Sequence, residues 1–149
     1  MPARSDPFHL ARFTEAQAPV WDAVCTELAQ GRKQTHWIWF VFPQLAGLGR
    51  SCMARYYGLS GLEEARAYLA HPVLGDRLRA CCGQLLLLPA ARAEQIFGSV
   101  DALKLRSCLT LFEAAAPSQP LFAQCLQRYF ASTRDPLTEH LLARGGTSG

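Results

Sequence analysis

The residues best suited to chemistry lie in one stretch, residues 31–51. Trp37 and Trp39 stand two positions apart, directly after a histidine, His36. An indole face can stack on a flat base or sugar, and an imidazole exchanges a proton near neutral pH. These residues therefore predict the wall of a ligand pocket. The alternative is an aromatic core cluster whose histidine bonds to a backbone carbonyl.

Basic and amide side chains flank the two tryptophans. Arg32 and Lys33 precede them, while Gln44 and Arg50 follow. A guanidinium can hold a phosphate through two parallel hydrogen bonds, and an ammonium attracts it as a point charge. We predict that these four residues line the rim of the pocket and contact the ligand. The alternative for each cation is simple solvation.

A second candidate set lies on a helix expected over residues 101–115. On a helical wheel, Asp101 falls within the apolar stripe and Lys104 lies on its flank. Polar groups in such places cost free energy unless they are paired or face a cavity. One solution is an ion pair between the two residues, and the other is a cavity into which both side chains point.

His71 comes just before a helix N-terminus, which is a natural anion site, so it joins the predicted ligand contacts. Its alternative is a plain capping role. The sequence has no Walker motif, GxGxxG, HExxH or GxSxG, and its six cysteines show no CxxC spacing. We therefore predict neither a metal nor a cofactor, and we expect most of the cysteines to be small buried hydrophobes.

Capping residues and hydrophobic periods together predict an all-α, single compact domain of about seven to nine helices. Asp6-Pro7 is expected to open a short helix that ends at Phe13, and Thr14 with Gln17 to form a capping box for the next helix. The domain is predicted to cover residues 6–143, between a flexible N-terminus (1–5) and a disordered tail (144–149). Further helices are expected at residues 52–57, 62–70, 73–88, 101–115, 120–130 and 136–143, with Ser51 and Asp135 as the caps of the first and the last of them. Residues 92–97 are expected to form one or two helical turns that end at Gly98. Residues 37–42 are expected to form a short helix or an irregular buried segment that ends at Pro43.

Composition narrows the class of protein. The chain has 149 residues, of which 50% are hydrophobic and 18% are charged, so it is long and apolar enough to bury one core. Its net charge of +3 comes from scattered basic residues, which argues against a dedicated nucleic-acid binder. No apolar run reaches bilayer length or resembles a signal peptide, so we expect a cytoplasmic protein, either a monomer or a small homo-oligomer.

Several segments resemble one bacterial family, the domain-of-unknown-function family 1810, whose members are sometimes labelled "calpastatin". The segment His36-Trp37-Ile38-Trp39-Phe40-Val41-Phe42-Pro43-Gln44 is the most specific of them. The others include Gly47-Leu48-Gly49-Arg50-Ser51, Tyr68-Leu69-Ala70-His71-Pro72, Ile96-Phe97-Gly98 and Lys104-Leu105-Arg106-Ser107-Cys108-Leu109-Thr110-Leu111-Phe112. The resemblance spans residues 6–142. It implies an all-helical single domain and brings no established activity. The family usually has serine and methionine where this chain has Cys108 and Leu109.

A fainter resemblance links Glu64-Ala65, His71-Pro72, Leu74-Gly75, Lys104 and Leu111-Phe112 to the helical NADAR proteins. Those proteins act on N-glycosidic bonds of ADP-ribose-like or ribosylamino compounds, and none of their catalytic residues is carried over to this chain.

These observations lead to one functional hypothesis with two alternatives. The hypothesis is that the protein binds a nucleotide-like ligand and, if it is an enzyme, hydrolyses an N-glycosidic bond. In that case Asp101 stabilises an oxocarbenium-like state or activates water, while Lys104 or His36 assists the leaving group. The first alternative is a non-catalytic helical protein-interaction module. The second is RNA binding through the same aromatic and basic rim.

Overall fold

The structure, a computed structural model, describes residues 5–89 and 92–146. Within these residues it has nine α-helices, one 3-10 helix and no strand, which confirms the all-α prediction. The elements are α1 (Ala11–Gln17), η1 (Ala18–Val20), α2 (Trp21–Gln30), α3 (Ile38–Val41), α4 (Cys52–Tyr57), α5 (Leu62–Ala70), α6 (Leu74–Leu87), α7 (Ala93–Ala115), α8 (Pro120–Phe130) and α9 (Pro136–Gly146).

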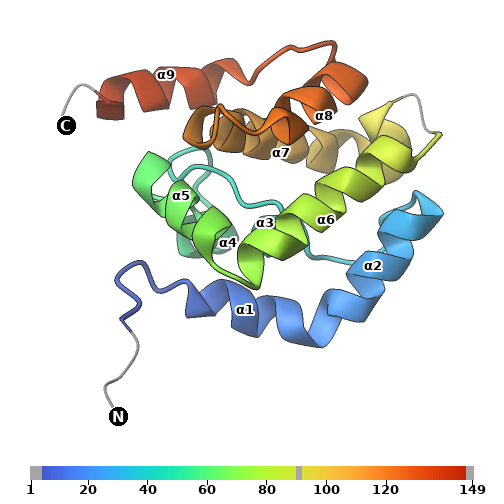
Figure 1. The fold of residues 1–149 in the computed structure, drawn as a ribbon, viewed down its shortest axis with the longest axis horizontal. Coiled ribbons are helices and arrows are strands. Elements are labelled where there is room, and N and C mark those ends of the chain that lie inside the picture. Colours follow the sequence, from blue (N-terminus) through green and yellow to red (C-terminus); the bar gives the residue numbers. More distant parts are fainter. Residues whose placement is uncertain (1–4, 90–91, 147–149) are drawn as a thin grey trace.

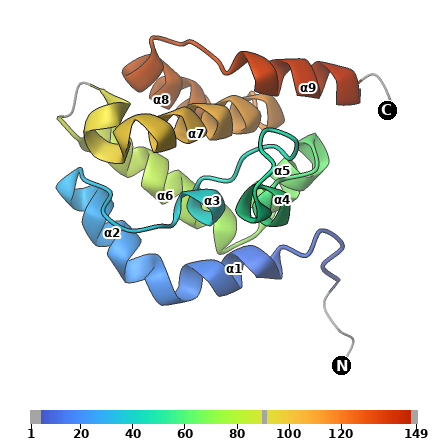
Figure 2. The same ribbon diagram turned by 180° about the vertical axis from the view of Figure 1, so that it is seen from behind.

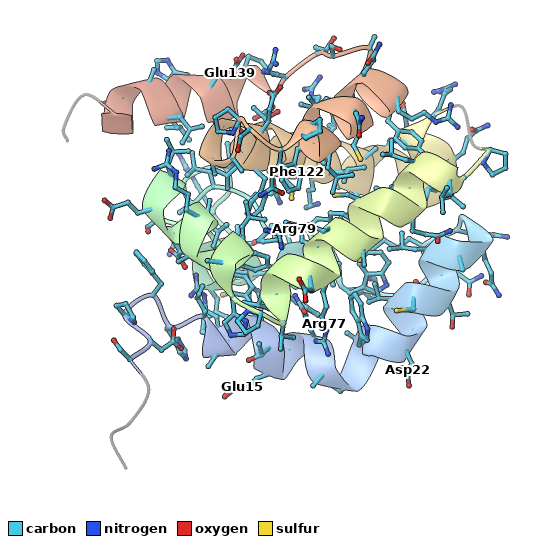
Figure 3. The ribbon with its side chains drawn as sticks, viewed as in Figure 1. Glu15, Asp22, Arg77, Arg79, Phe122 and Glu139 are labelled. Atoms are coloured by element: carbon cyan, nitrogen blue, oxygen red, sulfur yellow. The ribbon has the colours of Figure 1, made fainter. Side chains whose placement is uncertain are left out.

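The helices surround one hydrophobic core (Figures 1 and 2). α7 packs against α8 and α5, α6 packs against the same two helices, and α2 packs against α6. In both views the short helices α3 and α4 lie between α1 and α7. α9 runs along the outer edge of the molecule, beside α7. Phe122 points inward from α8, while Glu15, Asp22 and Glu139 point outward (Figure 3). Apolar side chains therefore hold the fold together from within.

The N-terminal helix begins later than the sequence suggests. α1 starts at Ala11, and the Asp6 carboxylate accepts hydrogen bonds from the backbone N–H groups of Ala11 and Leu10 at 3.0 and 2.7 Å. These two bonds lower the pKa of Asp6 below its ordinary value of 3.8. The capping box predicted for Thr14 and Gln17 is wrong, because both residues lie inside α1 and Gln17 is buried. The Asp6 carboxylate therefore caps α1, although the helix begins five residues further along the chain, at Ala11.

Two helices in the second half of the chain, α7 and α9, can be compared with their predicted boundaries. α7 is broken at Gly98, whose φ of 79° is readily adopted only by glycine, as the predicted stop at this residue requires. α9 continues to Gly146, so the predicted disordered tail is wrong for residues 144–146. The cation Arg144 lies in the last turn of α9, where it interacts favourably with the helix dipole. A difference of one or two residues in the position of a helix end is also common. Residues 147–149, and residues 1–4 of the predicted flexible N-terminus, lie outside the described residues.

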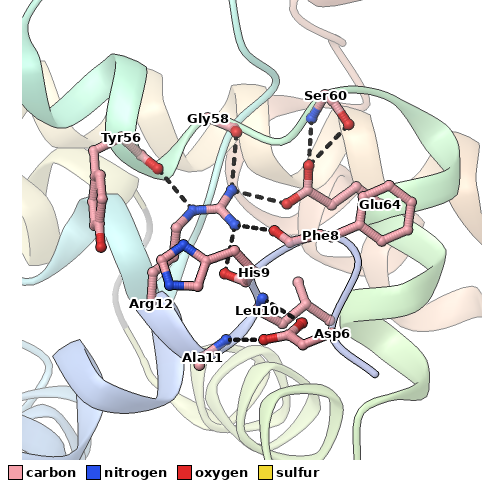
Figure 4. Close-up of polar contacts among 10 residues, drawn as sticks. All are labelled: Asp6, Phe8, His9, Leu10, Ala11, Arg12, Tyr56, Gly58, Ser60 and Glu64. Carbon is pink, nitrogen blue, oxygen red and sulfur yellow. Dashed lines mark hydrogen bonds and ion pairs between the residues drawn. The ribbon is translucent and has the colours of Figure 1, made fainter. Parts of the chain in front are cut away.

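A buried arginine ties α1 to the segment that joins α4 and α5 (Figure 4). The Arg12 guanidinium lies 2.8 Å from the Glu64 carboxylate, and Glu64 in turn accepts hydrogen bonds from the backbone and hydroxyl of Ser60. Because every charge in this cluster has a partner, it can be buried at an acceptable cost. The guanidinium also donates to the carbonyls of Phe8, His9, Tyr56 and Gly58. This cluster fixes the backbone that forms walls of two pockets described below.

Candidate functional site

One pocket collects several of the residues singled out in the sequence. It has a volume of about 370 Å³ and lies between α7, the segment that leads from α3 into α4, and the start of α9. Trp39 forms part of its wall, so we call it the Trp39 pocket. Its other aromatic residue is Tyr57, its polar residues are Gln44, Lys104, Ser107 and Asp135, and its larger aliphatic residues are Leu45, Leu48, Val100, Leu103 and Leu137. An apolar pocket with a few convergent polar groups is typical of a small-molecule site.

Trp39 and Lys104 meet at this pocket from two different helices. Trp39 is partly exposed, and the Lys104 ammonium lies 4.9 Å from the centroid of its ring. A cation at this distance is attracted by the negative face of the indole. The pairing fixes both side chains at the edge of the pocket without removing either from solvent.

Asp101 lies between the only two lysines of the chain. One of its carboxylate oxygens is 2.8 Å from the Lys33 ammonium, and the other is 3.4 Å from the Lys104 ammonium. The predicted ion pair between Asp101 and Lys104 is therefore present. Lys104 lines the Trp39 pocket, but Asp101 does not. The alternative in which both side chains point into one cavity is therefore wrong for Asp101.

Trp37 belongs to the core. Its side chain is 0% exposed, and it packs against Phe42 and Phe97. Its indole N–H donates to a Glu27 carboxylate oxygen at 3.0 Å, and the Lys33 ammonium lies 5.0 Å from its ring centroid. The prediction that Trp37 stacks on a ligand is wrong, because no face of the ring is open.

The carboxylate that holds Trp37 also shapes the loop before it. Glu27 accepts hydrogen bonds from the backbone N–H groups of Gln34 and Thr35 and from the Thr35 hydroxyl. Burial by itself raises the pKa of Glu27, but these bonds and the Trp37 N–H outweigh it and lower the pKa from 4.5 to about 2. The residue is therefore ionised near neutral pH and anchors the whole turn.

Two comparisons with known proteins found a match, and one of them identifies the family. The model of the family described as "Protein of unknown function (DUF1810)" matches residues 7–142. The chain belongs to the DUF1810 family. The crystal structure of the conserved hypothetical protein Rv1873 from Mycobacterium tuberculosis is similar, with 50% sequence identity and a TM-score of 0.91. That match covers 93% of this chain and 99% of the other. No match was found among curated proteins, and the likeness to the NADAR proteins stays a prediction.

Four predicted contacts of this DUF1810 chain that flank the two tryptophans lie outside the pocket. One of them, Lys33, pairs with Asp101 and lies over the ring of Trp37. The side chains of Arg32, His36 and Arg50 are exposed, and none of them lines the Trp39 pocket. A long flexible cation next to a buried aromatic segment is usually solvated, because the loop that carries it must lie at the surface. The prediction that these residues surround one ligand with Trp39 is therefore wrong in this structure.

His71 caps the N-terminus of α6 in this DUF1810 chain. Its ring nitrogen Nδ1 accepts hydrogen bonds from the backbone N–H groups of Val73 and Leu74 at 3.1 and 3.3 Å. These are N–H groups that the first turn of α6 leaves without a helical partner. The capping alternative is correct, and the predicted ligand contact is wrong.

Two residues of the pocket, Tyr57 and Asp135, were not predicted from the sequence. Burial raises the pKa of the Tyr57 hydroxyl above its ordinary value of 10.0, so it is a hydrogen-bond donor near neutral pH. Within the described chain, the Tyr57 hydroxyl, the Gln44 amide and the Trp39 N–H have no protein partner. Asp135 accepts from the backbone and hydroxyl of Thr138 and lies 3.6 Å from the Arg106 guanidinium. Only its role as a helix cap was visible in the sequence.

Several further features of the DUF1810 chain bear on chemistry. Cys81, Cys82, Cys108 and Cys125 are buried and unpaired, and burial raises the pKa of Cys108, so its thiol is a core hydrophobe. Among the described residues, no three His, Cys, Asp or Glu side chains are placed to share a metal ion. Over the same residues, no helix combines the length and apolar character that a membrane span requires.

Proposed function

We propose that this protein binds a small ligand made of one flat ring and one anionic group, such as a nucleoside monophosphate, in the Trp39 pocket. The observation that carries the proposal is the meeting of Trp39 with Lys104 at a pocket where, among the described residues, the Gln44 amide and the Tyr57 hydroxyl have no protein partner. A ring packs against the indole and the aliphatic side chains, and its anionic group reaches the ammonium. The free Gln44 amide and Tyr57 hydroxyl are placed to bond to a base edge or a sugar.

The charges near the pocket favour one negative charge on the ligand. Two ammonium groups, Lys33 and Lys104, share the single carboxylate of Asp101, which leaves one positive charge. Asp135 and Arg106 neutralise each other on the other side. The Lys104 ammonium is 3.4 Å from Asp101, which is long for a charged hydrogen bond, so it can turn towards an anion at little cost. A volume of about 370 Å³ lies near the lower end for ligand pockets and suits a mononucleotide better than a dinucleotide.

Binding has more support than N-glycoside hydrolysis. Hydrolysis needs a carboxylate that reaches the sugar or a water molecule. Asp101 lies outside the pocket between two lysines, and the carboxylate that does line it, Asp135, caps α9 and pairs with Arg106. Neither has an oxygen directed at the cavity without a partner. Of the two carboxylates, only Asp135 lines the pocket.

The test is calorimetric titration and thermal unfolding with AMP, GMP and UMP, with ADP-ribose and NAD as larger ligands and with uncharged adenosine as the matched control. A ligand present at about 100 times its Kd stabilises the folded state by about 2.7 kcal/mol. Lys104→Gln is expected to weaken monophosphate binding about tenfold. Arg32→Gln removes a cation outside the pocket and is expected to leave binding unchanged. Equal effects of the two variants, or no binding of any of these compounds at about 10 mM, contradict the proposal.

A second candidate, the protein-interaction module, is favoured by the side chains around the mouth of the pocket. Val100, Leu103 and Leu137 are 65%, 57% and 47% exposed, and large apolar groups gathered in this way often mark an interface. The simplest partner is a second copy of the chain. Sedimentation at rising concentration should show dimers that the double variant Val100→Gln, Leu103→Gln abolishes. A single species of monomer mass at every concentration contradicts self-association.

A further inference from the structure

A second cavity, separate from the Trp39 pocket, lies on the other side of Leu45. It has a volume of about 670 Å³ and is enclosed by the N-terminal segment, the first turns of α5 and the outer half of α9. Leu45 is only 6% exposed and lines both cavities, so it forms the partition between them. We call the second cavity the Leu141 pocket. Its apolar side chains are Phe8, Leu45, Leu62, Leu141 and Leu142.

Two side chains of opposite charge line this apolar cavity from the same helix. Glu63 and Arg66 stand one helical turn apart on α5, which places both on one face. They form no ion pair with each other, and within the described residues Glu63 has no hydrogen-bonding or ionic partner. Glu64, the next residue, contrasts with both because its carboxylate is fully engaged by Arg12 and Ser60.

The guanidinium of Arg66 is held in place by the end of another helix. Its Nε donates to the Ala115 carbonyl at the C-terminus of α7, at 3.0 Å. This bond orients the planar group, and its two terminal nitrogens have no partner among the residues that the structure describes. Two parallel N–H groups are the arrangement that binds a carboxylate in bidentate fashion.

We propose that the Leu141 pocket binds an apolar zwitterion, either a free amino acid with a large apolar side chain or a short apolar peptide. The carboxylate of the ligand pairs with Arg66, its ammonium pairs with Glu63, and its side chains occupy the leucine-lined cavity. A ligand that supplies both charges pairs with the Glu63 carboxylate and with the terminal nitrogens of Arg66 at once, and its apolar body gains from leaving water. This site is independent of nucleotide binding in the Trp39 pocket.

The experiment uses the full chain, with L-phenylalanine and the dipeptide Leu-Leu as probes, measured by calorimetry. The two probes distinguish an amino acid from a peptide, because their opposite charges are separated by different distances. Two half-ligands serve as matched controls: 3-phenylpropionate lacks the ammonium, and phenethylamine lacks the carboxylate. At least one zwitterion is expected to bind about tenfold more tightly than either half-ligand. Half-ligands that bind as well as the zwitterions overturn the proposal, as does no binding of either probe at about 10 mM.

Variants locate the site. Glu63→Gln and Arg66→Gln are each expected to weaken zwitterion binding about tenfold, and Arg66→Lys is expected to weaken it less, because the charge remains while the bidentate geometry is lost. Glu15→Gln removes an exposed carboxylate on α1 and serves as the control. Unchanged affinity in both Glu63→Gln and Arg66→Gln overturns the assignment. If a variant fails to fold, the comparison of zwitterions with half-ligands on the unmodified chain still tests whether the protein binds an apolar zwitterion. AMP binding is expected to stay the same in all these variants, so a failure of this proposal is distinct from a failure at the Trp39 pocket.

Discussion

Two tryptophans only two residues apart have opposite environments in this fold. Trp37 is fully buried, and its N–H donates to the Glu27 carboxylate, while Trp39 is partly exposed and its N–H has no partner in the described part of the chain. Each ring nevertheless has a lysine ammonium about 5 Å from its centroid, and both lysines pair with Asp101. Trp37 is the N-cap residue of α3 and has non-helical backbone angles, whereas Trp39 lies within the helix. The start of α3 therefore gives one tryptophan a structural role in the core and leaves the other at an open surface.

The largest effect is expected for Trp37→Ala. Removing a fully buried indole leaves a cavity and an unpartnered buried carboxylate, so the free energy of unfolding should fall by about 3–5 kcal/mol. Urea unfolding followed by circular dichroism measures the change. A loss below about 1 kcal/mol contradicts the core assignment of Trp37.

The next effect concerns Glu27 and depends on pH. Because the folded-state pKa of Glu27 is about 2 and its ordinary value is 4.5, its stabilising contribution is complete above pH 4.5 and is lost as the pH falls towards 2. Glu27→Gln should lower the free energy of unfolding by about 2 kcal/mol at pH 7, since charged hydrogen bonds are replaced by neutral ones. The difference between the two proteins, measured by urea unfolding across this range, should shrink as the pH falls. A difference that stays constant between pH 4.5 and 2 contradicts the pKa assigned to Glu27.

A smaller effect on stability, with a clear effect on binding, is expected for Trp39→Ala. Stacking of a base on an aromatic side chain contributes about 1–3 kcal/mol, so the Kd for a mononucleotide should rise about tenfold to a hundredfold. Trp21→Ala is the matched control, because Trp21 is also partly exposed and lies under a cation, Arg77, at 4.7 Å, yet does not line the pocket. Calorimetry measures both variants. Equal losses of affinity show that the effect is general destabilisation and contradict the Trp39 site.

The sequence was a good guide wherever the determining interaction is local. The break at Gly98, the cap at Ser51 and the helix after Asp135-Pro136 follow from residues within one turn of the feature that they set. Hydrophobic periods likewise placed the long helices, because one face of each must be buried against its neighbours.

The candidate site was only partly predictable, because its wall is assembled from distant segments. Trp39 and Lys104 come from helices far apart in the sequence, and Tyr57 and Asp135 reach the same pocket from two further segments. Nothing local marks Glu27 as the hydrogen-bond partner of Trp37, or Phe97 as one of the rings that cover it. The types and spacing of the residues in 31–51 pointed to the correct stretch of the chain. They did not indicate which of its side chains face the Trp39 pocket.

The smallest effect is expected for Asp101→Asn, and its sign distinguishes two roles for the residue. As a counterion shared by Lys33 and Lys104, Asp101 reduces the positive charge next to the Trp39 pocket. Removing its charge should therefore tighten monophosphate binding about twofold to fivefold at low salt and by less at high salt, where screening is stronger. If Asp101 is instead the catalytic carboxylate, the variant leaves binding almost unchanged and abolishes turnover of an N-glycosidic ligand. Calorimetry at two salt concentrations, combined with a product assay on ADP-ribose, separates the two roles, and weaker binding in the variant contradicts the counterion role.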